Sequence, residues 1–315
     1  MRPSREHAAS VFREDRNFVV IARNPKPRRK RWKKILLILG VTVIVLYVLL
    51  LIVVFVCQDK LIFPAPQSFP DTTPAAANIP FEDLHIPVDA STQIHAWWIP
   101  AQQPATNVIL YFHGNGYSLE SEARREASIF HQIGTNLLLA DYRGYGTSSH
   151  VRANGPRSEA DASAAMRYLI EQRHVNPSDV WIAGWSIGSA VATQLATVSP
   201  HAAGLILFSP ITSVNDVAHE EYGPYLLRPL EWLGQHQNDF NSKVRISSVH
   251  VPVLIMSGTL DELAPPWMAK MLYDRANAPK TIHMIEGAHH DDFMDVGDGN
   301  VVLEIQSFIS GAPKP

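Results

Sequence analysis

A serine between two glycines stands at residues 184–188 of this 315-residue chain, in the sequence GWSIG. A short apolar run, residues 180–183, precedes it, and a helical pattern, residues 187–198, follows it. In that context G-x-S-x-G predicts a strained strand-to-helix turn, which exposes the hydroxyl and needs small neighbours because strand and helix approach closely. The segment predicts that Ser186 is a nucleophile; a structural serine in a tight turn is the alternative.

A serine hydroxyl attacks a carbonyl only when a base accepts its proton and an acid orients that base. After such a turn, the acid and then the histidine are expected further along the chain. Two downstream loops fit this order: SGTLDE, residues 257–262, and EGAHHDD, residues 286–292. Both follow apolar runs that read as strands, so we expect them at the sheet edge that carries Ser186.

The second loop contains two adjacent histidines, His289 and His290. Adjacent residues of an extended loop point in opposite directions, so only one of them can face Ser186, and we favour His289. HHDD could also suggest a metal cluster, but no H-E-x-x-H or paired-carboxylate spacing occurs elsewhere, and no Gly-rich loop ends in Lys-Ser/Thr. We therefore expect neither a metal nor a cofactor.

Several carboxylates compete for the role of the acid. We favour Asp261, with its neighbour Glu262 second and Asp216, after the preceding strand, third. Asp141 also ends a strand, but in DYRGYG we expect it to brace the turn through Arg143.

The elements that must position these loops are visible as periodic runs. Strands are expected at 81–88, 93–99, 108–112, 137–140, 180–183, 205–208, 253–256 and 281–285, and helices at about 119–132, 159–172, 187–198, 265–276 and 301–309. Alternation of continuous apolar strands with helices predicts a mostly parallel eight-stranded sheet covered on both faces, with the first two strands antiparallel. The fold class is therefore α/β.

One segment interrupts this alternation. Residues 211–250 separate two strands and contain EYGPYLLRPLEWLGQ, which is rich in Tyr, Leu and Trp. Long insertions at the carboxyl edge of such a sheet often form lids or binding walls. We predict a lid-like insertion; an ordinary helix packed on the body is compatible with the same pattern.

The amino-terminal part predicts a membrane anchor. Residues 35–57 are uncharged, and 19 of these 23 residues are Leu, Ile, Val or Phe. As a helix they would extend roughly 34 Å, enough to cross a hydrocarbon core of about 30 Å. Seven Lys and Arg lie directly before this run, at 26–34, which predicts a cytoplasmic amino terminus and a catalytic domain on the far side.

These features predict four regions: a basic cytoplasmic tail (1–34), a transmembrane helix (35–57), a Pro-rich tether (58–80) and the folded domain (81–312). The absence of cysteine after Cys57 and of an Asn-x-Ser/Thr acceptor leans towards a bacterial inner-membrane protein that faces the periplasm, with a lumenal or extracellular domain as the eukaryotic alternative. Because the basic run lies next to a spanning helix, we expect it to contact anionic lipid and not nucleic acid.

Taken in order, the motifs YFHGNG (111–116), LADYRGYGTS (139–148), GWSIGS (184–189), SGTLDELAPP (257–266) and GAHHDDF (287–293) resemble those of the α/β-hydrolases. The resemblance covers residues 58–310 and is to the single-pass, membrane-anchored serine hydrolases, a branch that includes monoacylglycerol and lysophospholipid lipases and acyl-protein thioesterases. It implies Ser186 as nucleophile, Asp261 as acid and His289 as base, with the backbone amides of Asn115 and Ile187 as oxyanion hole.

Two residues depart from the family pattern. Ser189 stands where the family often has a second glycine, and His290 stands where it often has asparagine. The second departure leaves open which histidine faces Ser186.

The function expected from this reading is hydrolysis of carboxylic esters or thioesters through an acyl-enzyme, without a cofactor. The anchor and the apolar insertion suggest an acyl chain of a lipid or an acylated protein as substrate. The alternatives are a peptidase or amidase of the same fold and a catalytically silent binding or scaffold protein. The sequence does not indicate an oligomeric state.

Overall fold

The computed structural model describes residues 28–65, 72–122, 125–223, 225–226, 228–229 and 238–312. The boundary between two compact units falls between Leu50 and Leu51. The described part of the first unit is the amino-terminal helix up to Leu50, and the second unit contains the sheet.

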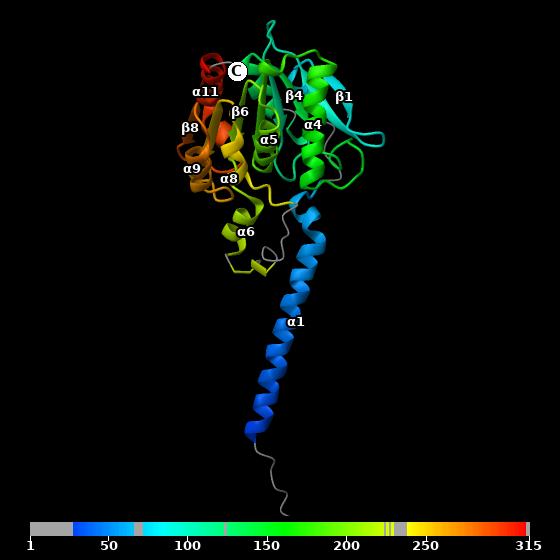
Figure 1. Ribbon diagram of the computed structural model, residues 1–315, viewed down its shortest axis with the longest axis vertical. Helices are drawn as coiled ribbons and strands as arrows, with labels where there is room; N and C mark the ends of the chain where they lie inside the picture. The colour runs from blue at the N-terminus through cyan, green and yellow to red at the C-terminus, as the bar shows by residue number, and fades with distance from the viewer. Residues whose placement is uncertain are drawn as a thin grey trace, which may run out of the picture. The chain divides into compact units, whose positions relative to one another are not determined.

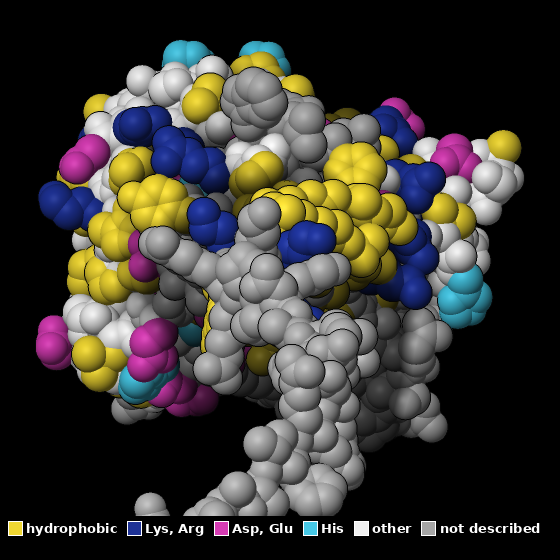
Figure 2. Space-filling view, turned by 90° about the horizontal axis from the view of Figure 1, so that it is seen from below, with side chains coloured by type: hydrophobic (Ala, Val, Ile, Leu, Met, Phe, Trp, Pro, Cys, Tyr) yellow, Lys and Arg dark blue, Asp and Glu magenta, His cyan; other side chains and the backbone are white. Residues whose placement is uncertain are grey.

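Helix α1, Arg28–Ile62, contains the predicted span and is longer than predicted at both ends. Over Arg31–Ile62 it is the one described helix that is long and apolar enough to cross a membrane. Most of its large apolar side chains between residues 35 and 56 are exposed, and hydrophobic side chains gather in the view from below (Figure 2). A helix that is apolar all round and uncovered by protein fits a membrane anchor.

The predicted tether begins with the end of this helix and not with an irregular segment. Phe63, directly after α1, is buried, with its ring against those of Tyr142 and Phe240. A short 3₁₀ helix, η1, follows at Pro74–Ala77. Residues 66–71 of the tether and 1–27 of the basic tail lie outside the described residues.

The folded unit is built on one eight-stranded sheet in the order β1-β2-β4-β3-β5-β6-β7-β8 (Figure 1). Its strands are β1 Glu82–Pro87, β2 Gln93–Ile99, β3 Val108–Phe112, β4 Asn136–Ala140, β5 Val180–Trp185, β6 Gly204–Phe208, β7 Val253–Gly258 and β8 Lys280–Ile285. Strand β2 pairs antiparallel with β1 and β4, and the other neighbours are parallel. The predicted mostly parallel sheet with an antiparallel start is confirmed.

Helices cover both faces of the sheet, as the alternation of elements predicts. Along β3, Val108 and Leu110 enter one buried cluster, whereas Ile109 and Tyr111 enter the other. One face is covered by α4 (Gly155–Glu171), α5 (Ile187–Thr197), α8 (Ser242–Arg245), η3 (Ile246–Ser248) and α9 (Pro266–Arg275). The opposite face is covered by α3 (Arg125–Ile133), α10 (Phe293–Val296) and α11 (Asp298–Gly311). Helices α4 and α5 are neighbours on their face (Figure 1).

Helix α4 begins four residues earlier than predicted because its start has its own signals. The side chain of Asn154 accepts a hydrogen bond from the backbone N–H of Arg157 at 3.1 Å. Pro156 occupies the first turn, where a proline costs no hydrogen bond. Two shorter elements, α2 (Leu119–Glu122) and η2 (Pro177–Asp179), complete the connections between strands.

The insertion at 211–250 is described in part. It contains α6, Val214–Tyr222, whose first turn is capped by the Ser213 side chain, and it ends in α8 and η3. Residues 224, 227 and 230–237, which hold most of the Leu- and Trp-rich stretch, lie outside the described residues. The lid-like role of this insertion stays a prediction.

Candidate active site

The turn between β5 and α5 holds Ser186 in a strained backbone conformation. Its φ is 54° and its ψ is −121°, a combination that residues other than glycine rarely adopt. A Cβ atom on Gly184 would lie 2.1 Å from the carbonyl oxygen of Gly188, and one on Gly188 would lie 2.2 Å from that of Phe112. The sequence therefore needs both glycines, because strand, turn and helix leave no space for a side chain.

His290, not His289, lies against this serine. Its Nε2 atom is 3.0 Å from the Ser186 Oγ atom, and its Nδ1 atom is 2.9 and 3.0 Å from the two carboxylate oxygens of Asp261. Since a carboxylate only accepts, Nδ1–H donates to Asp261, and the Nε2 lone pair of the neutral ring faces the serine hydroxyl. The three side chains thus have the connectivity of a nucleophile, a base and an orienting acid.

The expectation that His289 faces Ser186 is wrong. The His289 side chain is half-exposed, with Nδ1 3.3 Å from Oε2 of Glu262, and Glu262 is itself largely exposed. Its backbone N–H donates to Asp292 at 2.6 Å, and the preceding turn passes through Gly287 at a φ of 76°. These local bonds turn His289 towards solvent, and its neighbour consequently points into the site.

Asp261 is placed by the close approach of the two loops that follow β7 and β8. A Cβ atom on Gly258 would lie 2.2 Å from the carbonyl oxygen of Ala288, two residues before His290. One oxygen of Asp261 also accepts the backbone N–H of Ala264 at 2.7 Å. Asp261 is buried, so water does not compete for its bonds. The third candidate acid, Asp216, instead binds Lys243 at 2.7 Å at the start of α6.

Of the two predicted oxyanion residues, Ile187 follows Ser186 directly, and Asn115 belongs to a loop that lies against the same turn. Ile187 is the first residue of α5, where backbone N–H groups have no partner within the helix. Asn115 follows Gly114, and a Cβ atom on Gly114 would lie 2.8 Å from the Trp185 ring and 3.4 Å from Cβ of Ser186. The loop after β3 therefore lies directly against the serine turn, and the oxyanion role of these amides stays a prediction.

The predicted bond between Asp141 and Arg143 is wrong. Arg143 binds Asp161 of α4, with Nη2 2.6 Å from Oδ1, and both side chains are buried. Asp141 lies 3.2 Å from Nε2 of His113 and accepts the backbone N–H of Leu119 at 3.0 Å. The acid thus supports the loop that carries Asn115.

Asp141 is fully buried with two histidines close to its carboxylate. Burial raises the pKa of Asp141, but interactions with His113 and His95 outweigh burial and hold that pKa below its ordinary value. Burial would also lower the pKa of His95, yet the carboxylates of Asp141 and Asp83 raise it above its ordinary value. Asp141 therefore stays ionised although it is buried, with two imidazoles beside its carboxylate.

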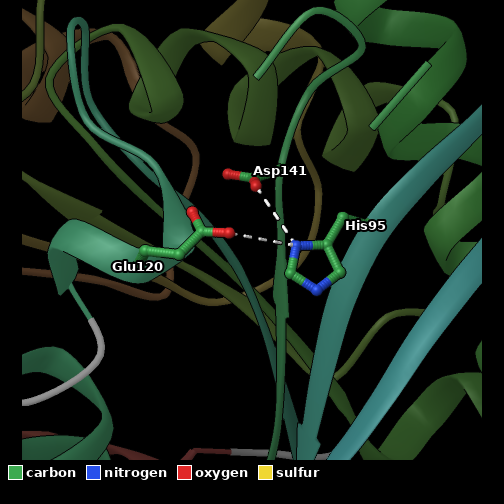
Figure 3. Close-up of side chains that lie close together, drawn as sticks. All are labelled: His95, Glu120 and Asp141. Carbon is green, nitrogen blue, oxygen red and sulfur yellow. Dashed lines mark ion pairs between the residues drawn. The ribbon is translucent and has the colours of Figure 1, made fainter. Parts of the chain in front are cut away.

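Two features of this region could not be predicted from the spacing of residues in the sequence. The first is that His290, and not His289, contacts Ser186, which depends on the geometry of the loop. The second is a group of possible metal ligands. A group formed by His95, Glu120 and Asp141 could hold a metal ion (Figure 3), and among the described residues it is the only such group. Its members come from three separate elements, so no local motif marks them. The HHDD stretch does not form such a group within the described residues.

Several known proteins are similar to this chain in sequence. Residues 103–245 match the family described as "Serine aminopeptidase, S33". An uncharacterized protein of Mycobacterium tuberculosis is 33% identical over 257 residues, which cover 80% of this chain and 87% of the relative. The α/β-hydrolase domain-containing protein WAV2 of Arabidopsis thaliana is 28% identical over 281 residues, covering 82% and 89% of the two chains.

A lipase and an esterase are also similar. The lysophosphatidylserine lipase ABHD12 of Danio rerio is 27% identical over 212 residues, 62% of this chain and 54% of the lipase. The esterase Pf2001 of Pyrococcus furiosus has the same fold, with a TM-score of 0.66, 19% identity and coverage of 79% of this chain and 98% of the esterase. The chain belongs to the α/β-hydrolase superfamily, and this membership supports a hydrolase activity.

Proposed function

We propose that this protein is a membrane-anchored serine hydrolase that cleaves carboxylic esters or thioesters through an acyl-enzyme on Ser186. The observation that carries the proposal is the buried chain of contacts from Ser186 through His290 to Asp261. A serine, an imidazole and a carboxylate in this order are the groups that nucleophilic acyl transfer requires.

In the first half of the reaction, His290 Nε2 accepts the hydroxyl proton while the Ser186 oxygen attacks the acyl carbon. Asp261 stabilises the resulting imidazolium and keeps Nδ1 protonated. The backbone amides of Asn115 and Ile187 bind the oxyanion; removing one such donor costs on the order of a hundredfold or more in turnover. His290 then protonates the leaving alcohol or thiol, and the acyl group remains on Ser186.

In the second half, His290 accepts a proton from water, which attacks the acyl-enzyme and releases the carboxylic acid. The ring is held for both halves because its other nitrogen is bound to Asp261 and because it lies beside Trp185, with ring centroids 5.5 Å apart. No step requires a cofactor.

An acyl chain from a lipid or an acylated protein is the substrate that the surroundings favour. Leu260 and Leu263, on either side of Asp261, are exposed, and so is Trp267 of α9. Trp267 donates its indole N–H to Glu220 of α6 at 3.2 Å, so the insertion borders the same loop. The similarity to a lysophosphatidylserine lipase agrees with this substrate class.

We place the hydrolase domain across the membrane from the amino terminus. The support is the cluster of seven Lys and Arg at 26–34 beside the apolar helix, since cytoplasmic flanks carry the excess of positive charge. In a bacterium this orientation puts the site in the periplasm; in a eukaryotic cell it would be lumenal or extracellular.

Labelling with a fluorophosphonate probe tests the proposal. The wild-type chain should react, Ser186→Ala should not, and Ser91→Ala, which changes an exposed serine between β1 and β2, should react like the wild type. Equal labelling of Ser186→Ala would refute Ser186 as nucleophile, and an unlabelled wild type would favour a silent scaffold. A panel of acyl esters, thioesters and aminoacyl amides then separates the proposed activity from that of a peptidase, which the matched family description keeps as second candidate.

A further inference from the structure

A buried cluster of one histidine and two carboxylates lies apart from the three side chains of the proposed triad. His95 comes from β2, Glu120 from α2 and Asp141 from the end of β4, and their side chains point towards one another (Figure 3). His95 is 3% exposed and Asp141 is 1% exposed. One potential ligand atom from each residue lies within 4.8 Å of the other two.

The protonation of His95 leaves one of its nitrogens without a hydrogen-bond partner. Nε2 is 2.6 Å from Oδ1 of Asp83, and because a carboxylate only accepts, Nε2–H is the donor. Nδ1 then faces Oδ2 of Asp141 at 3.5 Å and Oε1 of Glu120 at 3.8 Å. Neither Nδ1 nor Oδ2 of Asp141 makes a hydrogen bond, although both are buried. Buried polar atoms without partners are rare and call for a physical reason.

The distances distinguish two explanations for these unpartnered atoms: a direct bond between His95 and a carboxylate, and a metal ion bound between them. If Nδ1 carried a proton bonded to a carboxylate, a charge-assisted bond of about 2.7–2.9 Å would be expected. Ligands held about 2.1 Å from one tetrahedral ion lie about 3.4 Å apart, close to the distances of 3.5 and 3.8 Å found here. The spacing therefore fits three ligands of one ion better than a direct bond.

The surroundings of the cluster match those of a metal centre. A metal-binding histidine commonly donates its other ring N–H to a carboxylate, and Asp83 is that carboxylate here. The second oxygen of Glu120 accepts the hydroxyl of Ser118 at 2.6 Å. A Cβ atom on Gly146 would lie 2.4 Å from Oδ2 of Asp141 and 3.0 Å from Oε2 of Glu120, so a glycine keeps side-chain atoms away from both carboxylates.

We propose that His95, Glu120 and Asp141 bind a divalent transition-metal ion, with Zn²⁺ as the best match. One neutral imidazole and two carboxylates balance the charge of a dication. A mixed nitrogen and oxygen ligand set favours Zn²⁺ over Mg²⁺ or Ca²⁺, which prefer oxygen alone. The role is structural: the ion joins β2 and β4 to the segment that leads from Asn115 into α2. The site does not depend on the proposed hydrolase activity.

The test uses the full-length chain in detergent, stripped with EDTA, dialysed and loaded with ZnCl₂, with the bound metal counted by mass spectrometry. We expect one zinc ion per wild-type chain and a raised melting temperature. Glu120→Gln should lose the ion, and Asp83→Ala, at an exposed residue, should weaken zinc binding about 10- to 100-fold. His283→Gln, which disrupts the half-exposed pair with Glu304, is the matched control and should bind zinc like the wild type.

Two results would overturn the proposal. The first is a wild-type chain that takes up no zinc, which would leave a protonated His95 as the only counter-charge to the carboxylates. The second is zinc bound equally well by wild type, Glu120→Gln and Asp83→Ala, which would place the ion elsewhere. If Glu120→Gln does not fold, Asp83→Ala and the wild-type stoichiometry decide. Fluorophosphonate labelling of the same samples reports the proposed activity separately.

Discussion

The Nε2 atom of His290 lies 3.0 Å from the Oγ atom of Ser186, although 104 residues separate them along the chain. The distance is that of an ordinary hydrogen bond, so a proton can pass from the hydroxyl to the ring without rearrangement of the backbone. The adjacent His289 is close enough in sequence to be mistaken for the base, yet it contacts Glu262. This relationship gives the most direct test of the site.

Replacing each histidine by alanine should separate their roles. His290→Ala removes the group that accepts the Ser186 proton, and we expect hydrolysis of a p-nitrophenyl ester to fall by at least about a thousandfold. His289→Ala removes a half-exposed contact and should keep most of the activity. Steady-state kinetics on the two purified variants gives the comparison. Loss of activity in His289→Ala with retention in His290→Ala would contradict the geometry described here.

The glycine that brings the acid and histidine loops together should not tolerate a side chain. In Gly258→Ala the new Cβ atom would meet the carbonyl oxygen of Ala288 at 2.2 Å. We expect a loss of about 1–3 kcal/mol in the free energy of unfolding, together with lower turnover, because the contact between Asp261 and His290 is disturbed.

Gly299→Ala is the matched control for that substitution. A Cβ atom there meets nothing within 4 Å, and the residue lies in α11. The change should be neutral or should stabilise the chain by up to about 1 kcal/mol. Urea unfolding measures both variants, and an unchanged midpoint for Gly258→Ala would show that the two loops can move apart.

The sequence predicted the sheet and the serine turn well because both have local signals. Short apolar or partly apolar runs separated by turn residues place all eight strands, and G-x-S-x-G between a strand and a helix places Ser186. The missed start of α4 illustrates the weaker signal at element ends, where one cap residue, Asn154, decides the boundary.

The pairing of side chains could not be predicted in the same way. Which histidine turns inward depends on the φ of Gly287 and on backbone bonds such as Leu260 N–H to Ala288 O at 2.8 Å. Arg143 had a carboxylate two residues away, but its partner lies on α4. Such contacts depend on tertiary packing, and tertiary packing leaves no periodic pattern in a single sequence.

The buried pair of Arg143 and Asp161 should be costly to break on one side. Asp161 accepts both Nε of Arg143, at 2.9 Å, and its backbone N–H, also at 2.9 Å. Arg143→Met leaves the buried carboxylate without its cation, and we expect about 3–5 kcal/mol of destabilisation in urea. Lys270→Met, at an exposed pair 3.9 Å apart, should cost less than about 1 kcal/mol. Similar losses in both variants would argue against burial as the cause.

The orientation of the anchor can be tested with reporters. A phosphatase that is active only outside the cytoplasm should be active when fused to the carboxyl terminus and inactive when fused to the amino terminus. Replacing the seven Lys and Arg at 26–34 by glutamine should reduce this difference, because the charge asymmetry that sets the orientation is removed. An active amino-terminal fusion would reverse the proposed topology.

The ion pair at the start of α6 predicts a particular dependence of stability on pH. Burial raises the pKa of Asp216, but hydrogen bonds from Lys243 and Thr212 outweigh burial and hold that pKa below its ordinary value of 3.8. A carboxylate with a lowered pKa adds stability that is complete above the pKa of the unfolded chain and is lost as the pH falls through the pKa of the folded chain.

Lys243→Met removes the main favourable partner of Asp216, so the melting temperature of this variant should lie below that of wild type at pH 7. That gap should narrow as the pH falls from 3.8 towards the lower pKa of Asp216 in the folded wild type, because the stability that the ionised carboxylate contributes is lost over that interval. Thermal unfolding of both proteins between pH 7 and pH 3 measures the gap, and one that stays constant over this range would show that the lysine acts through packing and not through charge.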